Sequence, residues 1–575
     1  MSTILGMLAV AGGWLLFGAV FCGVGSWFFR APADERISWA DCFWAGLAAA
    51  TFLLLAVNLI LGIGVAVVAV IGVLGLGSLW LNRRAIVPPF AQIRRWWLWL
   101  PLGLVLVWLA NRALESPLWY DSGLYHFTLI RWANEHALPL GLGNLHGRLA
   151  FNQSFFVYVA FLNRFPLGGF GHNLANSLIL AAVLLTGVEA YGERRGTVRR
   201  RWLLLAFGLV AVFWTVAARR FGIHLSDPSP DHAVFLIELA VARYALSAFD
   251  PLGEPRQRER ARTLVVLLLG YLITLKLSAL FFALVLGGFA CWSRRRTAPA
   301  PVPQVSLRVW LVVLGGMFFW TLRGIVSSGY LVYPVVQTGL PVSWKIPAAL
   351  TIVEARAVRS WARAPGQAYE TVLASWQWLG PWWRANLSRW DFVAPLTLVS
   401  LALVLTLVTL VARRRRPAPT PEYFAPLALA TASSASLAFW FASAPDVRFL
   451  GAAGFLLPLA LLEVCFATWD ARAARWAAAI SLGALGLLLT AVCVGTQPGW
   501  IAVPPGGLAQ PIPVIKLVVH QTDSGLRVWM PEQGDLSWDA PLPCTPYFHP
   551  ELQLRAGRLF DEFRLTLADR PKPNP

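Results

Sequence analysis

The side chains best suited to chemistry gather in residues 119–152, a polar stretch in a largely apolar chain. The chain as a whole is 57% hydrophobic and only 13% charged. Charged groups are costly to bury unless they meet polar partners, so this gathering predicts a binding or catalytic site. Its ionisable residues are Asp121, His126, Arg131, Glu135, His136, His146 and Arg148.

Asp121 is the leading catalytic candidate. It follows an apolar run directly and precedes a predicted helix over residues 124–137. One interpretation is a helix N-cap, whose carboxylate accepts hydrogen bonds from first-turn amides. The other is a general base that deprotonates an acceptor hydroxyl at the membrane surface. The two are compatible, because a cap position holds a carboxylate rigidly. Helical spacing puts His126 on another face, so no simple Asp–His dyad is implied.

Two further outer segments carry candidate ligands. Residues 141–152 are rich in glycine, which lets a backbone approach a ligand closely, and include His146 and Arg148. The segment lacks the Lys-Ser/Thr ending of a phosphate loop, so an ordinary loop remains an alternative. In residues 227–232, Asp227, Asp231 and His232 surround two prolines, and Asp231 is a second N-cap candidate. No further ligand clusters beside these residues, so a divalent metal remains only an open alternative.

Lys276, Arg323 and Arg448 are cations at or near predicted membrane depth. Ionisable groups at such depth are costly and are functional candidates by default. A guanidinium fork matches phosphate, so an anionic lipid headgroup is the expected partner. The alternative is an arginine that anchors the chain at the membrane interface.

Composition places the chain among polytopic membrane proteins. Its mean hydropathy is +0.60, and apolar runs of about twenty residues recur along it. The net charge of +19 comes from short arginine clusters between these runs, which favours positive-inside topology over nucleic-acid binding. Six cysteines show no CxxC pair, so neither a metal site nor a disulfide framework is predicted.

The arginine clusters are assigned to the cytoplasm. The expected organisation is then a transmembrane domain, 1–496, and a periplasmic C-terminal domain, 497–575. The tail should hold strands at 514–520 and 526–530 and a helix near 556–567. The expected periplasmic loops are 114–173, 219–233 and 326–392, the last rich in tryptophan and typical of an interfacial aromatic belt.

Segment 263–293 is unusual because basic clusters flank both of its ends. It must therefore cross the membrane an even number of times, yet it is shorter than two spans of roughly 20 residues each. Two half-depth helices meeting near Lys276 are predicted. Lys276 would be the only ionisable residue at this apex, unpaired with any carboxylate and free to hold an anionic headgroup.

The whole arrangement resembles the GT-C superfamily of integral-membrane glycosyltransferases, which use polyprenyl-phosphate-linked sugars. The resemblance rests on many helices, an acid after an early helix in the first large outer loop, short outer helices and a soluble tail. It implies an all-α polytopic fold with about 13–14 transmembrane helices and a small α/β tail. Narrower strings resemble a bacterial family of membrane proteins: YDSGLYH (120–126), NLHGRLAFN (144–152), SPSPD with LKLS (226–231, 275–278), SGYLVYP (328–334) and WDAPLPCTPYF (538–548).

The resemblance implies a bacterial inner-membrane enzyme whose active site faces the periplasm and whose acceptor is a lipid, glycan or protein. Asp121 stands where the superfamily carries its catalytic acid, although no paired acid is evident beside it. The alternatives are a transporter or flippase, which often shows inverted repeats not visible here, a glycan polymerase or ligase, and a non-enzymatic assembly subunit. The expected substrate-binding residues are His126, His146, Arg148, Asp227, Asp231, Lys276, Arg323, Tyr333 and Arg448.

Overall fold

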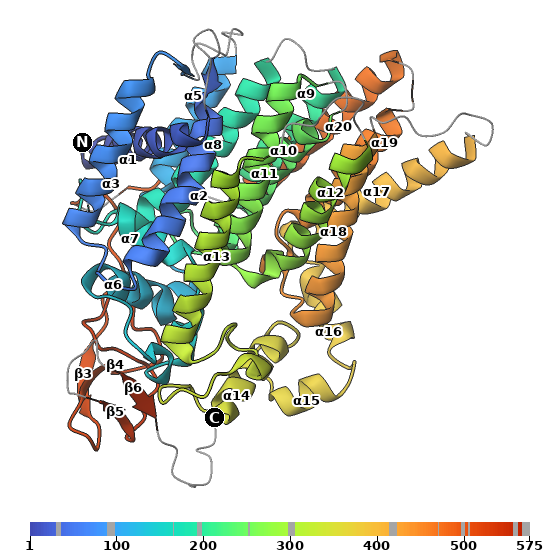
Figure 1. The fold of residues 1–575 in the computed structure, drawn as a ribbon. Helices are drawn as coiled ribbons and strands as arrows, with labels where there is room; N and C mark the ends of the chain where they lie inside the picture. The colour runs from blue at the N-terminus through green and yellow to red at the C-terminus, as the bar shows by residue number, and fades with distance from the viewer. Residues whose placement is uncertain are drawn as a thin grey trace.

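The computed structural model is mostly helical (69%), with a small sheet region near the C-terminus (Figure 1). This confirms the mostly helical fold predicted from the sequence and is consistent with a polytopic membrane protein. The described residues are 1–29, 36–88, 98–164, 166–192, 198–250, 253–296, 305–412, 423–467, 469, 471–495, 501–503, 506–555 and 562–565.

Within these ranges, nine helices are long and apolar enough to cross a membrane. They are α1 (Ser2–Gly25), α2 (Trp39–Val57), α3 (Val65–Asn82), α8 (Gly171–Gly192), α9 (Val198–Arg219), α13 (Leu307–Ser328), α17 (Trp390–Ala412), α18 (Phe424–Ser443) and α20 (Ala471–Gly495). The bundle also contains α5 (Trp99–Arg112), α10 (Pro230–Ala248), α11 (Pro255–Leu275), α12 (Leu280–Arg296) and α19 (Ala453–Phe466).

Local sequence explains both the starts of these helices and their packing. The Ser38 hydroxyl caps α2 by accepting from the Ala40 amide at 3.0 Å, and a proline opens α10 and α11. A Cβ at Gly25 would lie 1.7 Å from a carbonyl oxygen of α2, so only glycine permits this approach of α1. Such contacts between small residues are the usual way in which membrane helices pack closely.

Short elements gather at one end of the bundle, at the bottom of Figure 1. After α5 come a π-helical turn (Ser122–His126) and α6 (Phe127–Glu135); α7 (Phe155–Leu162) follows and lies further into the bundle, against α2 and α8. Between α13 and α17 lie α14 (Ala348–Trp361), α15 (Tyr369–Ala374) and α16 (Leu379–Asn386). The tail forms two antiparallel pairs, β3 (Leu517–Gln521) with β4 (Arg527–Pro531) and β5 (Leu552–Leu554) with β6 (Phe563–Leu565). A parallel pair, β1 (Ile37–Ser38) and β2 (Ile86–Val87), lies elsewhere in the chain.

The segments expected on one side of the membrane contact one another at this end. The Trp119 amide donates to Asp227 at 3.0 Å, linking the first two loops. The Phe563 amide donates to the Leu140 carbonyl at 2.8 Å, linking the tail to the first loop. Trp382 of α16 donates to the Pro445 carbonyl at 2.8 Å. Loops far apart in sequence therefore meet around a single end of the helices.

Two local predictions are wrong. The chain does break at Lys276, but α11 begins at Pro255 and has 21 residues, enough for about 31 Å of helix. The half-depth helices are not observed, because the basic cluster before residue 263 is part of α11. The predicted tail helix is contradicted at residues 563–565, which form β6, while 556–561 and 566–567 lie outside the described residues. The predicted strands of the first tail hairpin are confirmed as β3 and β4.

Candidate functional site

Asp121 is buried at the start of the π-helical turn Ser122–His126, and its side chain makes no capping bond. Asp121 occupies the N-cap position of the turn, but the capping hydrogen bonds predicted for its carboxylate are not made, so this part of the N-cap interpretation is wrong. Its Oδ1 accepts from Arg148 Nη1 at 3.0 Å, and its Oδ2 accepts from Arg448 Nη1 at 2.5 Å. The carboxylate thus lies between two guanidinium groups. π-helical turns are rare and frequently occur at functional sites.

The two arginines are themselves held by further acids. Arg148 lies in a short turn of the glycine-rich loop, and its Nε is 3.5 Å from Glu354 Oε1 of α14. Arg448 lies in the turn Val447–Leu450 between α18 and α19, and its Nε donates to Asp446 Oδ2 at 3.1 Å. Four separate parts of the chain thus supply these five side chains.

Lys276 completes the site together with Asp231, in the first turn of α10. Its Nζ donates to Asp231 Oδ1 and lies 3.9 Å from the centre of the Phe449 ring, next to Arg448. The prediction that Lys276 has no carboxylate partner is therefore wrong, because the chain break at Lys276 faces the start of α10. Ser229, rather than Asp231, occupies the N-cap position of that helix. We call Asp121, Arg148, Asp231, Lys276, Glu354, Asp446 and Arg448 the Asp121 cluster.

The cluster holds four acids and three cations, and each of its cations has a carboxylate partner. Burial would raise the pKa of Asp121, but the charges of Arg448 and Arg148 outweigh it and hold that pKa well below its usual range. Burial raises the pKa of Glu354 in spite of the neighbouring Arg148. Asp121 is therefore ionised at any physiological pH. An anionic ligand that takes up the Nη1 groups of both arginines would replace the Asp121 carboxylate there.

The two candidate histidines of the first loop are uncharged. Burial lowers the pKa of His126 to about 3 and that of His146 to about 3. His126 packs against Phe156 with ring centres 5.0 Å apart, and His146 meets the tail residue Tyr547 at 5.1 Å. As neutral rings they can hydrogen-bond a hydroxyl, but they add no positive charge for a phosphate.

Asp227 organises the loop that carries Asp121 and does not face the cluster. Its two oxygens accept from the backbone amides of Trp119 at 3.0 Å and His224 at 2.7 Å. Burial raises the pKa of Asp227 to about 7. Tyr333 is buried, and its hydroxyl lies against the backbone of Gly147, the residue before Arg148. A Cβ at Gly147 would be 3.0 Å from this hydroxyl.

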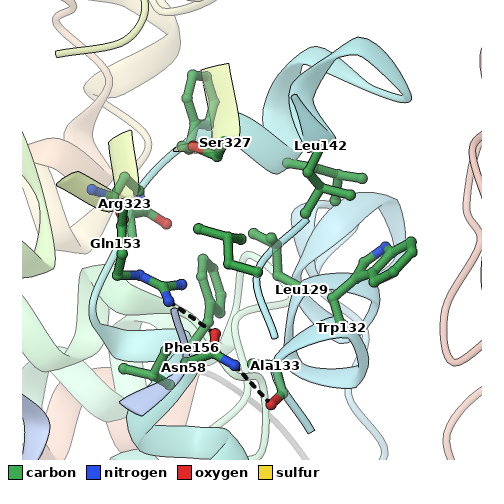
Figure 2. A pocket seen from close by; sticks show the side chains of 14 residues that line it. Asn58, Leu129, Trp132, Ala133, Leu142, Gln153, Phe156, Arg323 and Ser327 are labelled. Atoms are coloured by element: carbon green, nitrogen blue, oxygen red, sulfur yellow. Dashed lines mark hydrogen bonds between the residues drawn. The ribbon is translucent and has the colours of Figure 1, made fainter. Parts of the chain in front are cut away.

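Arg323 lies in a different pocket, shown in Figure 2, and none of the residues lining this pocket belongs to the Asp121 cluster. Its Nη1 donates to Asn58 Oδ1 at 2.9 Å, and Asn58 in turn donates to the Ala133 carbonyl at 3.2 Å. The cavity measures about 20 Å³, room for about one water molecule. Arg323 is thus not brought together with Asp121.

The spacing of Asp227, Asp231 and His232 does not build a metal site. Asp227 binds backbone amides and Asp231 binds Lys276, so their oxygens serve different partners. Across the ranges that the structure describes, no group of three or more His, Cys, Asp or Glu side chains is placed to hold a metal ion.

Sequence reasoning missed two members of the cluster, Glu354 and Asp446. Glu354 lies in α14, an amphipathic helix whose sequence carries no motif. Asp446 was visible beside Arg448 in the short segment between α18 and α19. An acid two residues before a functional arginine, in a loop too short to point it elsewhere, is the signal that could have identified it.

The family model described as "Domain of unknown function (DUF8201)" matches residues 7–455, so the chain belongs to this family. The matched region contains every member of the Asp121 cluster and ends before the strands of the tail. Searches of curated proteins and of solved structures give no match.

Proposed function

We propose that the chain is an integral-membrane glycosyltransferase of GT-C type. It moves a sugar from a polyprenyl-phosphate carrier to a lipid, glycan or protein acceptor during cell-envelope synthesis. The membrane is the bacterial inner membrane, and the Asp121 cluster faces the periplasm. If α10, α11 and the three shorter apolar helices are counted as crossings beside the nine candidate spans, the described residues give fourteen, within the expected 13–14.

The observation that carries this proposal is the Asp121 carboxylate held between Arg148 and Arg448. A glycosyl transfer from a lipid phosphate needs a base for the acceptor and cations for the departing phosphate. The cluster offers an ionised carboxylate for the first task. Two guanidinium groups, whose forks match phosphate oxygens, suit the second.

The paired resting state supports a sequence of steps. The donor phosphate binds Arg148 and Arg448 in place of the Asp121 carboxylate. Asp121 then accepts the proton of the acceptor hydroxyl, while the acceptor oxygen forms a bond to the sugar's anomeric carbon. The bond from that carbon to the phosphate oxygen breaks, and its electron pair leaves with the lipid phosphate. The two guanidinium groups stabilise the added negative charge.

The remaining side chains position the substrates. His126, His146 and the Tyr333 hydroxyl supply neutral hydrogen-bonding groups for sugar or acceptor hydroxyls. Lys276 acts through Asp231 and Phe449, which support the turn of Arg448, and is no longer assigned to the phosphate. Arg323 stays outside this mechanism because its partner is Asn58.

The proposal is tested by deleting the gene and analysing the lipid-linked sugars of the membrane. We expect a polyprenyl-phosphate sugar to accumulate and its acceptor product to disappear. Plasmid-borne wild type and Asp391→Asn, which neutralises a carboxylate outside the cluster, should restore the product, whereas Asp121→Asn should not. Restoration by Asp121→Asn would refute a base at this position and favour a transporter or an assembly subunit.

A further inference from the structure

Tail residues 535–547 lie against the part of the chain that carries Asp121. This segment contacts the chain on both sides of Asp121. On the near side, the Tyr120 hydroxyl donates to Asp535 Oδ2. On the far side, Gly123 contacts Ser537 and Trp538.

The first contact is made by the Gly123 carbonyl, which lacks its usual intrahelical hydrogen bond in the π-helical turn. In an α-helix the Phe127 amide would bond the Gly123 carbonyl, four residues back. Here the Phe127 amide bonds the Ser122 carbonyl, five residues back. The Gly123 carbonyl instead accepts from the backbone amides of Ser537 and Trp538, both at 2.8 Å. The tail therefore supplies hydrogen bonds that the turn itself has given up.

The second contact is a close fit between Gly123 and Trp538. A Cβ at Gly123 would lie 2.7 Å from the Trp538 indole, so only glycine is compatible with it. Trp538 is buried and has φ of 44°, a left-handed conformation that is strained for a tryptophan. Strained backbone of this kind persists where the surroundings enforce it, typically at functional sites. The indole also packs against Phe127, with ring centres 6.1 Å apart.

A third contact extends the same surface. Arg131 of α6 donates to the Asp539 carbonyl at 2.9 Å. The tail is thus attached to Tyr120, to the π-helical turn and to α6, which together carry Asp121. The side chain of Asp121 itself bonds only the two arginines among the contacts of the described residues.

We propose that tail segment 535–547 is a positioning element of the site, which fixes the π-helical turn and so holds the Asp121 carboxylate between Arg148 and Arg448. Trp538 and Asp535 are its positioning residues. The role of segment 535–547 in holding the π-helical turn follows from the contacts described above. The consequence for donor phosphate rests on the proposed function.

The test uses the full-length protein in nanodiscs with undecaprenyl phosphate as the probe. Trp538→Ala should speed amide hydrogen exchange over residues 122–127 by roughly tenfold or more. The matched control is Trp476→Ala, because Trp476 lies in α20, outside the tail, and is 63% exposed. Tyr120→Phe, which removes only a hydroxyl, should give a smaller change in the same direction. Unchanged exchange in both Trp538→Ala and Tyr120→Phe would overturn the inference.

A second readout separates positioning from general support of the fold. Loosening Asp121 frees the arginines, so Trp538→Ala should tighten probe binding severalfold in the wild-type background. In an Asp121→Asn background the same substitution should change probe binding little. An equal effect in both backgrounds would show that Trp538 does not act through Asp121. If the wild type does not bind the probe while exchange responds as expected, the positioning role stands and the donor assignment of the proposed function fails.

Discussion

Asp121→Asn should bind a lipid phosphate more tightly than the wild type while losing transfer. The substitution preserves the size of the side chain but removes the charge that Arg148 and Arg448 share. The amide oxygen can still accept from one guanidinium, whereas the amide nitrogen cannot accept from the other. A bound phosphate then no longer competes with a carboxylate for these arginines.

The size of both effects, on stability and on phosphate affinity, depends on the carboxylate partners that Arg148 and Arg448 keep in the variant. Arg448 keeps Asp446 at 3.1 Å, and Arg148 keeps Glu354 at 3.5 Å. One charge-assisted hydrogen bond is lost, which we expect to lower the free energy of unfolding by about 2 kcal/mol. The side chains of Arg148 and Arg448 are 24% and 12% exposed, so solvent screens part of the change. A gain of about 1.4 kcal/mol for phosphate, or about tenfold in Kd, is the corresponding expectation.

The measurement is a titration of the protein in nanodiscs with undecaprenyl phosphate, read by native mass spectrometry, alongside thermal unfolding. The control Asp391→Asn removes a carboxylate that is 1% exposed and bound to Arg389 at 2.7 Å, at the start of α17. It should lower stability and leave the Kd unchanged. Equal or weaker probe binding by Asp121→Asn, with the control unchanged, would refute the competition between Asp121 and phosphate.

Three further outcomes concern stability, each measured by thermal unfolding. Lys276→Met should lower the free energy of unfolding by about 3 kcal/mol because it leaves Asp231 unpaired; a neutral result would contradict the pair. The pKa of His146 is lowered to about 3, so its contribution to stability is lost as pH falls below about 6.5. His146→Gln should therefore reduce the loss of stability between pH 6.5 and 3. The pKa of Asp227 is raised to about 7, so its contribution is lost as pH rises from about 4 through 7, and Asp227→Asn should remove that slope.

The centre of the site was predictable because an apolar chain rarely gathers acids without a use for them. Asp121, Arg148, Asp231, Lys276 and Arg448 were all identified, and the structure brings them together. Their pairing was not predictable. Arg448 follows Asp121 by 327 residues, and only the folded loops show that the two meet.

The errors share a physical cause, since each treated a segment as if it were alone. Counting the arginines before residue 263 as loop made the segment too short for two helices, whereas those arginines belong to α11. The cap assigned to Asp121 assumed that first-turn amides were its best partners, but guanidinium groups from a later turn of the same loop and from the turn before α19 bind it instead. Tertiary partners override local preferences most strongly where charged groups are buried.

The charge balance of the cluster carries a consequence for the order of events under the proposed function. With no donor present, Asp121 is paired with two guanidinium groups and is a weaker base than an unpaired carboxylate, since their charges hold its pKa below the usual range. Donor phosphate removes those partners and thereby raises the basicity of the carboxylate. Under the proposed function, the base therefore becomes stronger once the phosphate that must leave is bound.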